Sequence, residues 1–317
     1  MKKSDFILTA KLEIIRIKPN KNNKKNRSYG IPYMGSKNAI AEWVVDYLPP
    51  GDTFVDLFAG GCSVTHCAMV QNKYKRYIVN DITDAPQLFC DAIAGKYRDE
   101  TRWISREDFF RLKDSDPYVR LCWSFGNNQK CYLYSRELEP WKKALHYARV
   151  FGDRSLLCEM GIAGDGSRRD VTAHMEEYRA KYIAWIGEQI SLERLQSLQS
   201  LQSLQSLQSL QSLERIESLQ RSYDEVELPD NAVVYCDPPY ANTAKYIGDF
   251  DHAKFYDWMR RQDRPIFVSE YFMPDDFVRV AARYKAVTLN QQNGNKAVEG
   301  IYVHESQINK IFIPTLF

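Results

Sequence analysis

The chain has 317 residues, of which 44% are apolar and 26% charged. This is enough to bury a core in one large domain or two small ones, and it excludes a long disordered chain. The formal net charge of +2, the absence of an apolar run of about 18 residues and the lack of an apolar leader give no sign of a membrane protein or a signal peptide.

The cysteines and histidines predict neither disulfides nor a metal site. The seven cysteines are scattered singly, without a C-x-x-C pair, and none of the five histidines has the spacing of a metal-ligand pair. This usage is typical of a reduced, cytoplasmic protein. We therefore expect a cytoplasmic protein without a bound metal and without a membrane partner.

Residues 1–28 form a basic N-terminal arm, with nine lysines and arginines against two acids. A cationic arm of this kind can contact phosphates. A solvated tail has the same composition, so both interpretations stay open.

The first half of the chain alternates strands and helices. An apolar strand over 53–58 runs into Ala59-Gly60-Gly61, and helical spacing resumes over 63–70. A second strand over 77–79 ends in Asn80-Asp81. Small residues directly after a strand let a ligand approach the backbone closely. An acid at the tip of the next strand is where nucleotide-binding α/β folds bind ribose hydroxyls.

The last third repeats this alternation. A run of β-formers over 232–236 leads into Asp237-Pro238-Pro239-Tyr240, and a helix over 252–261 and a strand over 266–269 follow. Alternating strands and helices predict a parallel α/β sheet. The two ends of the chain are therefore expected to form one Rossmann-like sheet.

The middle of the chain, residues 96–190, does not alternate in this way and is expected to be an inserted, mainly helical lobe. Its aromatic residues stand next to basic and amide residues, as in Asp108-Phe109-Phe110-Arg111 and Trp123-Ser124-Phe125. Exposed aromatics among such neighbours suit contact with nucleic acid. A small helical core with a charged surface has a similar composition.

A short repeat follows, in which an apolar residue falls at every third position from Leu192 to Leu219 with Gln and Ser between. Because an α-helix turns about 100° per residue, these leucines spiral around the axis and form no coiled-coil stripe. Leu and Gln favour helix, so we expect an irregular helical spacer.

The residues with the clearest chemistry are Asp237-Pro238-Pro239-Tyr240. A carboxylate and a backbone carbonyl can each accept a hydrogen bond from one N–H group of an aromatic amine. These two hydrogen bonds draw the amine nitrogen toward tetrahedral geometry and free its lone pair. Asp237 and the Pro238 carbonyl can be these two acceptors. The prolines make the loop rigid, and Tyr240 offers a ring face for a flipped-out base. A plain proline turn is the alternative.

The order of these motifs resembles the Dam-type adenine-specific DNA methyltransferases, in which target recognition lies between the cofactor and catalytic motifs. The matching segments are Tyr33 to Lys37, Thr53 to Val64, Asn80-Asp81-Ile82, Ser222-Tyr223-Asp224 and Val234 to Tyr240, with weaker matches at Ser269-Glu270-Tyr271 and Lys296 to Glu299. The resemblance implies transfer of a methyl group from S-adenosylmethionine to N6 of adenine in double-stranded DNA.

The resemblance also implies the roles of individual residues. It implies that Tyr33, Lys37, Asp81 and Asp237 contact the cofactor. The first strand and its loop add the cofactor-binding candidates Asp56, Phe58 and Gly60, and the chemistry of the amine makes Asp237, Pro238, Pro239 and Tyr240 the catalytic candidates. Lys37 can pair with a carboxylate, the cofactor or the substrate. The sequence departs from the family's F-x-G-x-G loop because Cys62 stands at the last glycine, which strains the loop if that position needs a positive φ.

We expect a methyltransferase catalytic domain over 29–95 and 222–317, a target recognition lobe over 96–190 and the repeat spacer over 191–221. Methylation of the cytosine N4 amine is the nearest alternative, because the geometry at the amine is the same. A non-catalytic DNA-binding or assembly protein that keeps the fold is an alternative of a different class.

Overall fold

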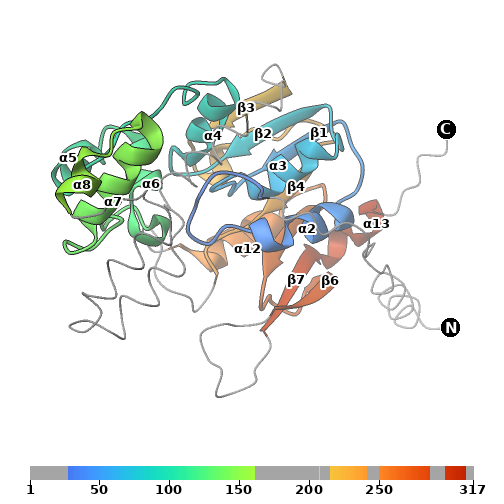
Figure 1. Ribbon diagram of the computed structural model, residues 1–317. Helices are drawn as coiled ribbons and strands as arrows, with labels where there is room; N and C mark the ends of the chain where they lie inside the picture. Colours follow the sequence, from blue (N-terminus) through green and yellow to red (C-terminus); the bar gives the residue numbers. More distant parts are fainter. Residues whose placement is uncertain (1–27, 161–206, 208–214, 241–249, 286–296, 312–317) are drawn as a thin grey trace. The chain divides into compact units, whose positions relative to one another are not determined.

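The computed structural model describes residues 28–160, 207, 215–240, 250–285 and 297–311 (Figure 1). The chain divides into two compact units. The first comprises the described residues of Met1–Gly30, Ser36–Cys90 and Leu210–Phe317, and the second those of Ile31–Gly35 and Asp91–Ser209. Residues 1–27 of the basic arm lie outside the described residues. No helix in the described ranges is long and apolar enough to cross a membrane.

The first unit is built on a seven-stranded sheet with the order β3-β2-β1-β4-β5-β7-β6. The first five strands in this order run parallel, and β7 and β6 continue the sheet in antiparallel pairing. The strands are β1 (Thr53–Asp56), β2 (Arg76–Asn80), β3 (Ile216–Leu219), β4 (Val233–Cys236), β5 (Ile266–Glu270), β6 (Phe277–Lys285) and β7 (Ala297–His304).

Helices follow the strands of this unit, as the alternation predicts. Their bounds are η1 (Asn38–Ile40), α2 (Ala41–Tyr47), α3 (Ser63–Val70), α4 (Ala85–Ile93, which continues into the second unit), η6 (Tyr223–Glu225), α12 (His252–Arg260), η7 (Glu305–Gln307) and α13 (Ile308–Ile311). The expected strand–helix order over 53–80 and 232–269 is confirmed, with α3 at the predicted residues.

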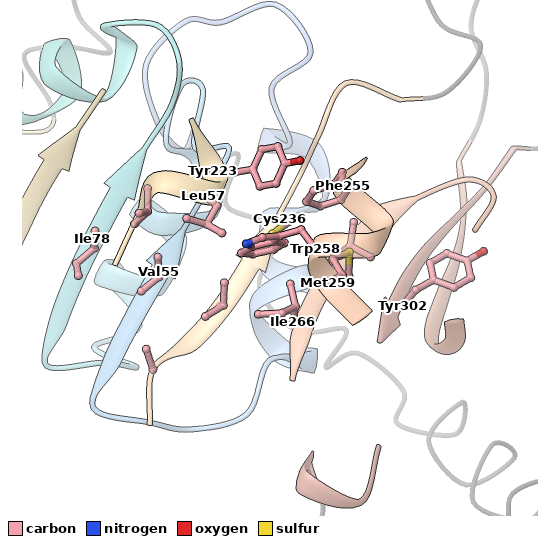
Figure 2. Packing of buried hydrophobic residues seen from close by; sticks show 14 of the residues in the cluster. Val55, Leu57, Ile78, Tyr223, Cys236, Phe255, Trp258, Met259, Ile266 and Tyr302 are labelled. Atoms are coloured by element: carbon pink, nitrogen blue, oxygen red, sulfur yellow. The ribbon is translucent and has the colours of Figure 1, made fainter. Parts of the chain in front are cut away.

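The two faces of the sheet are covered by different helices because side chains alternate along a strand. Val55 of β1 belongs to a core cluster with Trp258 and Met259 of α12 (Figure 2). Phe54, one residue earlier, packs its ring 6.4 Å from that of Tyr77, whose hydroxyl donates to the Ala68 carbonyl of α3 at 3.1 Å. The sheet is therefore covered on both faces, as in a doubly wound α/β fold.

The order of the strands reverses between β1 and β4, which pair in parallel through Phe54↔Val233 to Asp56↔Tyr235. In open α/β sheets, ligands bind outside the carboxyl ends of the strands at this switch point. The segments that follow β1 and β4 are the glycine-rich loop and Asp237-Pro238-Pro239-Tyr240. The sheet thus brings the two predicted motifs to the same edge.

The prediction of a helical spacer is wrong at its C-terminal end, where Ile216–Leu219 form strand β3. This strand pairs in parallel with β2, with Tyr77↔Ile216 and Asn80↔Leu219 in register. The Arg215 guanidinium also donates to the Tyr74 carbonyl at 2.6 Å. Pairing with an exposed strand edge outweighs the helix preference of Leu and Gln. Apart from Leu207, the earlier part of the repeat lies outside the described residues.

The second unit is helical over the part that the structure describes, apart from an isolated bridge between Ser124 and Tyr132. Its elements are α5 (Arg106–Leu112), α6 (Pro117–Cys122), η2 (Phe125–Asn127), α7 (Glu139–His146), η3 (Tyr147–Phe151) and α8 (Ser155–Glu159). Phe109 and Trp123 are buried and form core, whereas Phe110 and Phe125 are 50% and 63% exposed. The aromatic residues of this segment are thus divided between the two interpretations that the sequence left open.

Candidate active site

The loop after β1 is shaped by residues with left-handed backbone. Gly60 has φ 46°, and Cys62 has φ 57° and ψ 31° directly before α3. The Cys62 N–H donates to the Ala59 carbonyl at 2.6 Å, which closes a tight turn. The position where the family often carries glycine therefore does require a positive φ, and Cys62 adopts it at the steric cost expected for a residue with a Cβ.

Gly30 packs directly against this loop. Its φ is 74°, and a Cβ added to it would lie 2.2 Å from the Gly61 carbonyl oxygen and 2.8 Å from the Ser63 nitrogen. The Gly30 N–H donates to His66 Nδ1 at 2.8 Å. Burial lowers the pKa of His66 to about 4, which keeps this ring neutral and able to accept. Only glycine lets the two backbone segments approach this closely.

Asp81 links the tip of β2 to the glycine-rich loop. Its Oδ2 accepts the Gly60 N–H at 2.9 Å, and its Oδ1 accepts both the backbone N–H and the hydroxyl of Thr83, at 2.9 and 2.8 Å. A carboxylate has about four acceptor positions. One position on Oδ2 therefore remains for a ligand, while the others fix the loop.

Asn80, buried next to it, is a positioning residue to which the sequence analysis assigned no role. Its amide donates to the Leu57 carbonyl at 3.0 Å and to the Arg221 carbonyl at 3.1 Å. Its Oδ1 accepts the Arg221 N–H at 3.0 Å. Asn80 therefore ties the end of β1 to the segment after β3. The Asn-Asp pair at the end of a strand was the available signal for it.

Asp56 points away from the α12 face and into the α3 face. Its side chain is almost fully buried, and its Oδ2 accepts the Thr65 hydroxyl at 2.8 Å. The other oxygen, Oδ1, is buried without a hydrogen-bond partner among the described residues. Burial, followed by repulsion from Asp237 and Asp81, raises the pKa of Asp56 to about 7.

We expect Asp56→Asn to change the pH dependence of stability. Since folding raises this pKa from 3.8 to about 7, the stability that Asp56 allows is fully present below about pH 4 and is lost as the pH rises through 7. The loss is at most about 4 kcal/mol, at ~1.4 kcal/mol per pKa unit. Urea unfolding should show the variant gaining stability relative to wild type between pH 5 and pH 8.

The exposed Asp52 provides a control, because removing a surface carboxylate in Asp52→Asn should leave the free energy of unfolding as in wild type at both pH values. An Asp56→Asn variant whose stability runs parallel to wild type from pH 5 to pH 8 would contradict the assignment of a raised pKa.

Lys37 and Asp237 form an ion pair at the end of β4. Lys37 Nζ lies 2.8 Å from Asp237 Oδ1, with the two side chains only 11% and 16% exposed. Burial raises the pKa of Asp237, Lys37 lowers it, and Glu299 raises it again, with a net shift upward. Lys37 therefore pairs with a carboxylate, one of the three partners that the sequence left open, and its ammonium favours the ionised form of Asp237.

Tyr240 is held on three sides. Lys37 Nζ lies 4.3 Å from the centre of its ring, and Tyr271 meets the ring edge-on at a centroid distance of 4.8 Å. Its hydroxyl donates to Glu299 Oε1, and that oxygen also lies 3.5 Å from Lys37 Nζ. Glu299 comes from β7, which was not predicted, whereas Tyr271 directly follows β5, which was. Both residues lie in weaker motif matches, and neither had a role assigned from the sequence.

The remaining candidate residues lie in different surroundings. Pro238 is buried, and the Pro239 carbonyl lies 2.8 Å from His252 Nε2 at the start of α12. Phe58 stacks on Tyr223 at 5.5 Å and belongs to the aromatic packing around α12. Tyr33 is half-buried in the second unit. No group of three or more His, Cys, Asp or Glu within the described ranges could hold a metal ion.

Comparison with known proteins finds a match to a family model over part of the chain. Residues 33–152 match the model of the D12 class N6 adenine-specific DNA methyltransferases. The match includes Lys37, the glycine-rich loop and Asp81, and it ends before Asp237-Pro238-Pro239-Tyr240. No curated protein matches the chain. The match agrees with the motif order and favours adenine over the cytosine alternative. Over residues 33–152 the chain is therefore similar to the D12 class N6 adenine-specific DNA methyltransferases, and this similarity supports methyl transfer to adenine N6.

Proposed function

We propose that this enzyme binds S-adenosylmethionine at the carboxyl edge of β1 and β2, and methylates an adenine flipped out of double-stranded DNA against the loop after β4. The observation that carries the proposal is the buried Lys37–Asp237 pair at the switch point of the sheet. The pair holds a carboxylate where an amine can be bound beside a cofactor.

The charges at this edge fit the cofactor. S-adenosylmethionine carries a cationic sulfonium and an α-ammonium group together with one carboxylate. The described edge holds the carboxylates of Asp56, Asp81 and Asp237 against the single ammonium of Lys37. Asp56 Oδ1 also lacks a partner there. An acidic set with one cation suits a ligand of this charge, and the bound cofactor supplies an electrophilic methyl group.

Gly60 and Asp81 would hold the nucleoside end of the cofactor. Gly60 leaves the loop open to close approach, and the Asp81 Oδ2 that accepts the Gly60 N–H has one further acceptor position. We therefore expect Asp81 to bind one ribose hydroxyl rather than both. Tyr33 and Phe58 remain proposed contacts of the cofactor on the strength of the resemblance.

Asp81→Ala should weaken binding of S-adenosylmethionine at least about tenfold, because a hydrogen bond to a charged group contributes about 1.5–3 kcal/mol. Isothermal titration calorimetry on the folded variant measures this directly. Thr83→Ala is the matched control, since it removes one donor to Oδ1 and leaves Oδ2 and Gly60 in place. Equal affinity of Asp81→Ala and wild type would remove Asp81 from the cofactor site.

After β4, Asp237 and the Pro238 carbonyl would each accept a hydrogen bond from one N–H group of the adenine amine. Lys37 favours the ionised form of Asp237, which is the stronger acceptor, and the two prolines hold the loop rigid. The nitrogen lone pair is then directed away from the ring plane. These residues bind and orient the amine, and Tyr240 would stack on the flipped base.

Other parts of the chain have proposed roles in DNA recognition and in linking the units. We assign recognition of the DNA sequence to the helical second unit, where Phe110 and Phe125 are exposed, and a spacer role to the repeat. All seven cysteines are free, which supports a reduced, cytoplasmic setting. A role in restriction-modification would require a cognate endonuclease.

The proposed reaction is tested by incubating the protein with tritium-labelled S-adenosylmethionine and unmethylated double-stranded DNA, followed by digestion to nucleosides. Label in N6-methyl-2′-deoxyadenosine supports the proposal. Label in N4-methyl-2′-deoxycytidine supports the alternative amine, and unlabelled DNA with bound cofactor supports a non-catalytic protein.

A further inference from the structure

The geometry points to Glu299 of β7 as a positioning residue that fixes the ring of Tyr240 and so prepares the surface on which the flipped adenine stacks. The inference rests on the proposed function and concerns a residue outside the family match. Glu299 is fully buried, yet it carries a carboxylate, and its contacts explain why a charge is placed there.

Strand β7 delivers this carboxylate because it runs antiparallel to β5. In the register Gly300 pairs with Glu270, the last residue of β5, so Glu299 reaches the edge where β4 also ends. Its Oε1 accepts the Tyr240 hydroxyl and lies 3.5 Å from Lys37 Nζ. A buried carboxylate is costly unless it is paired and hydrogen-bonded. Glu299 gains both kinds of contact, and each involves a proposed site residue.

The same strand fixes the other side of the Tyr240 ring. Gly300 leaves room for the Tyr302 side chain, since an added Cβ would lie 2.4 Å from that ring. The Tyr302 hydroxyl donates to the Tyr271 carbonyl at 3.2 Å, and the Tyr271 ring packs edge-on against Tyr240 at 89°. Strand β7 therefore holds the Tyr240 hydroxyl directly through Glu299 and the edge of its ring indirectly, through Tyr302 and Tyr271.

This arrangement changes what the hydroxyl of Tyr240 is expected to do. From the sequence alone, only the ring face would matter and Tyr240→Phe would have little effect. In the structure, Tyr240→Phe removes the hydrogen bond to the buried carboxylate of Glu299, which is the contact that fixes the orientation of the ring. We expect kcat to fall about tenfold, the lower end of the effect of losing a hydrogen bond to a charged group.

The test compares Glu299→Ala, Glu299→Gln, Tyr240→Phe and the double variant Glu299→Ala/Tyr240→Phe. Methyl transfer from tritium-labelled S-adenosylmethionine to unmethylated genomic DNA gives kcat, and calorimetry gives the Kd of the cofactor. We expect Glu299→Ala to lower kcat about 10- to 100-fold and to move the Kd less than about threefold. Glu299→Gln keeps an acceptor for the hydroxyl and should retain kcat within about fivefold of wild type.

Because Glu299→Ala and Tyr240→Phe remove the same hydrogen bond, their effects should not add, and the double variant should match Glu299→Ala within about twofold. The exposed Glu305, which follows β7, is the matched control, and Glu305→Ala should behave as wild type.

Additive effects, a Glu299→Gln variant as slow as Glu299→Ala, or wild-type kcat in Tyr240→Phe would overturn the inference. If Glu299→Ala does not fold, Glu299→Gln and Tyr240→Phe still decide it. Wild-type protein that forms no N6-methyladenine defeats the proposed function itself, whereas active wild type with unaffected variants defeats only the role of Glu299.

Discussion

Replacing Asp237 with asparagine is expected to lower turnover about 10²- to 10³-fold at saturating S-adenosylmethionine. The size follows from removing one group that stabilises charge developing in the transition state. Lys37 lies 2.8 Å from Asp237 Oδ1. An asparagine there would turn its carbonyl oxygen toward the ammonium and present its NH₂ group to the adenine amine. Two donors would then face each other, and the amine would lose its acceptor.

The effect should appear in kcat more than in binding, because the interaction strengthens as the nitrogen becomes tetrahedral. Cofactor affinity has to be measured separately, since the resemblance also places Asp237 near the cofactor. The exposed Asp230, before β4, provides the control, and Asp230→Asn should keep wild-type turnover. Turnover of Asp237→Asn near the wild-type rate would contradict the proposed role.

Lys37→Met should cost about 3 kcal/mol of stability at neutral pH, because it leaves two buried carboxylates without their cation. Lys37 lies within 3.5 Å of Glu299 and closer still to Asp237. Without Lys37 the pKa of Asp237 rises further. Since a raised pKa makes stability fall as pH rises, the deficit should be larger at pH 8 than at pH 5. Urea unfolding at the two pH values measures it.

The same substitution should move the acidic limb of the pH–rate profile to higher pH, since Asp237 has to be ionised to accept the amine. Lys75→Met is the control for removing a lysine, because the Lys75–Asp52 pair is 82% and 75% exposed. Such surface pairs contribute about 0–1 kcal/mol. A Lys37→Met variant as stable as Lys75→Met would show that the Lys37 ammonium is not needed to offset the cost of burying the carboxylates of Asp237 and Glu299.

The parallel half of the sheet could be predicted because its strands are short apolar runs that end in distinctive residues. Val233–Cys236 is followed by Asp-Pro-Pro-Tyr, and Thr53–Asp56 leads to the glycine-rich loop. Parallel strands buried on both faces show continuous apolar runs, which are visible in one sequence. A carboxylate was one of three partners that the sequence left open for Lys37, and its identity as Asp237 required the fold.

The antiparallel half was not predicted, and with it the surroundings of Tyr240. Strand β7 carries Glu299 and Gly300 within its length, which interrupts the alternation that marks a strand. Strand β3 was hidden in the repeat, whose composition favours helix. In both cases the pairing partner, distant in sequence, decides the structure. The contact between Glu299 and Tyr240 was missed for this reason.

We propose that Asp237, at the end of β4, binds the adenine amine and makes methyl transfer to N6 possible. Sequencing with modified-base detection, applied to DNA from cells that express wild type or Asp237→Asn at equal levels, tests it most directly. We predict N6-methyladenine in a fixed sequence context with wild type, and a loss of about 10²-fold or more in the rate of its formation with Asp237→Asn. N4-methylcytosine in place of methyladenine, or equal adenine methylation by both proteins, would contradict the account.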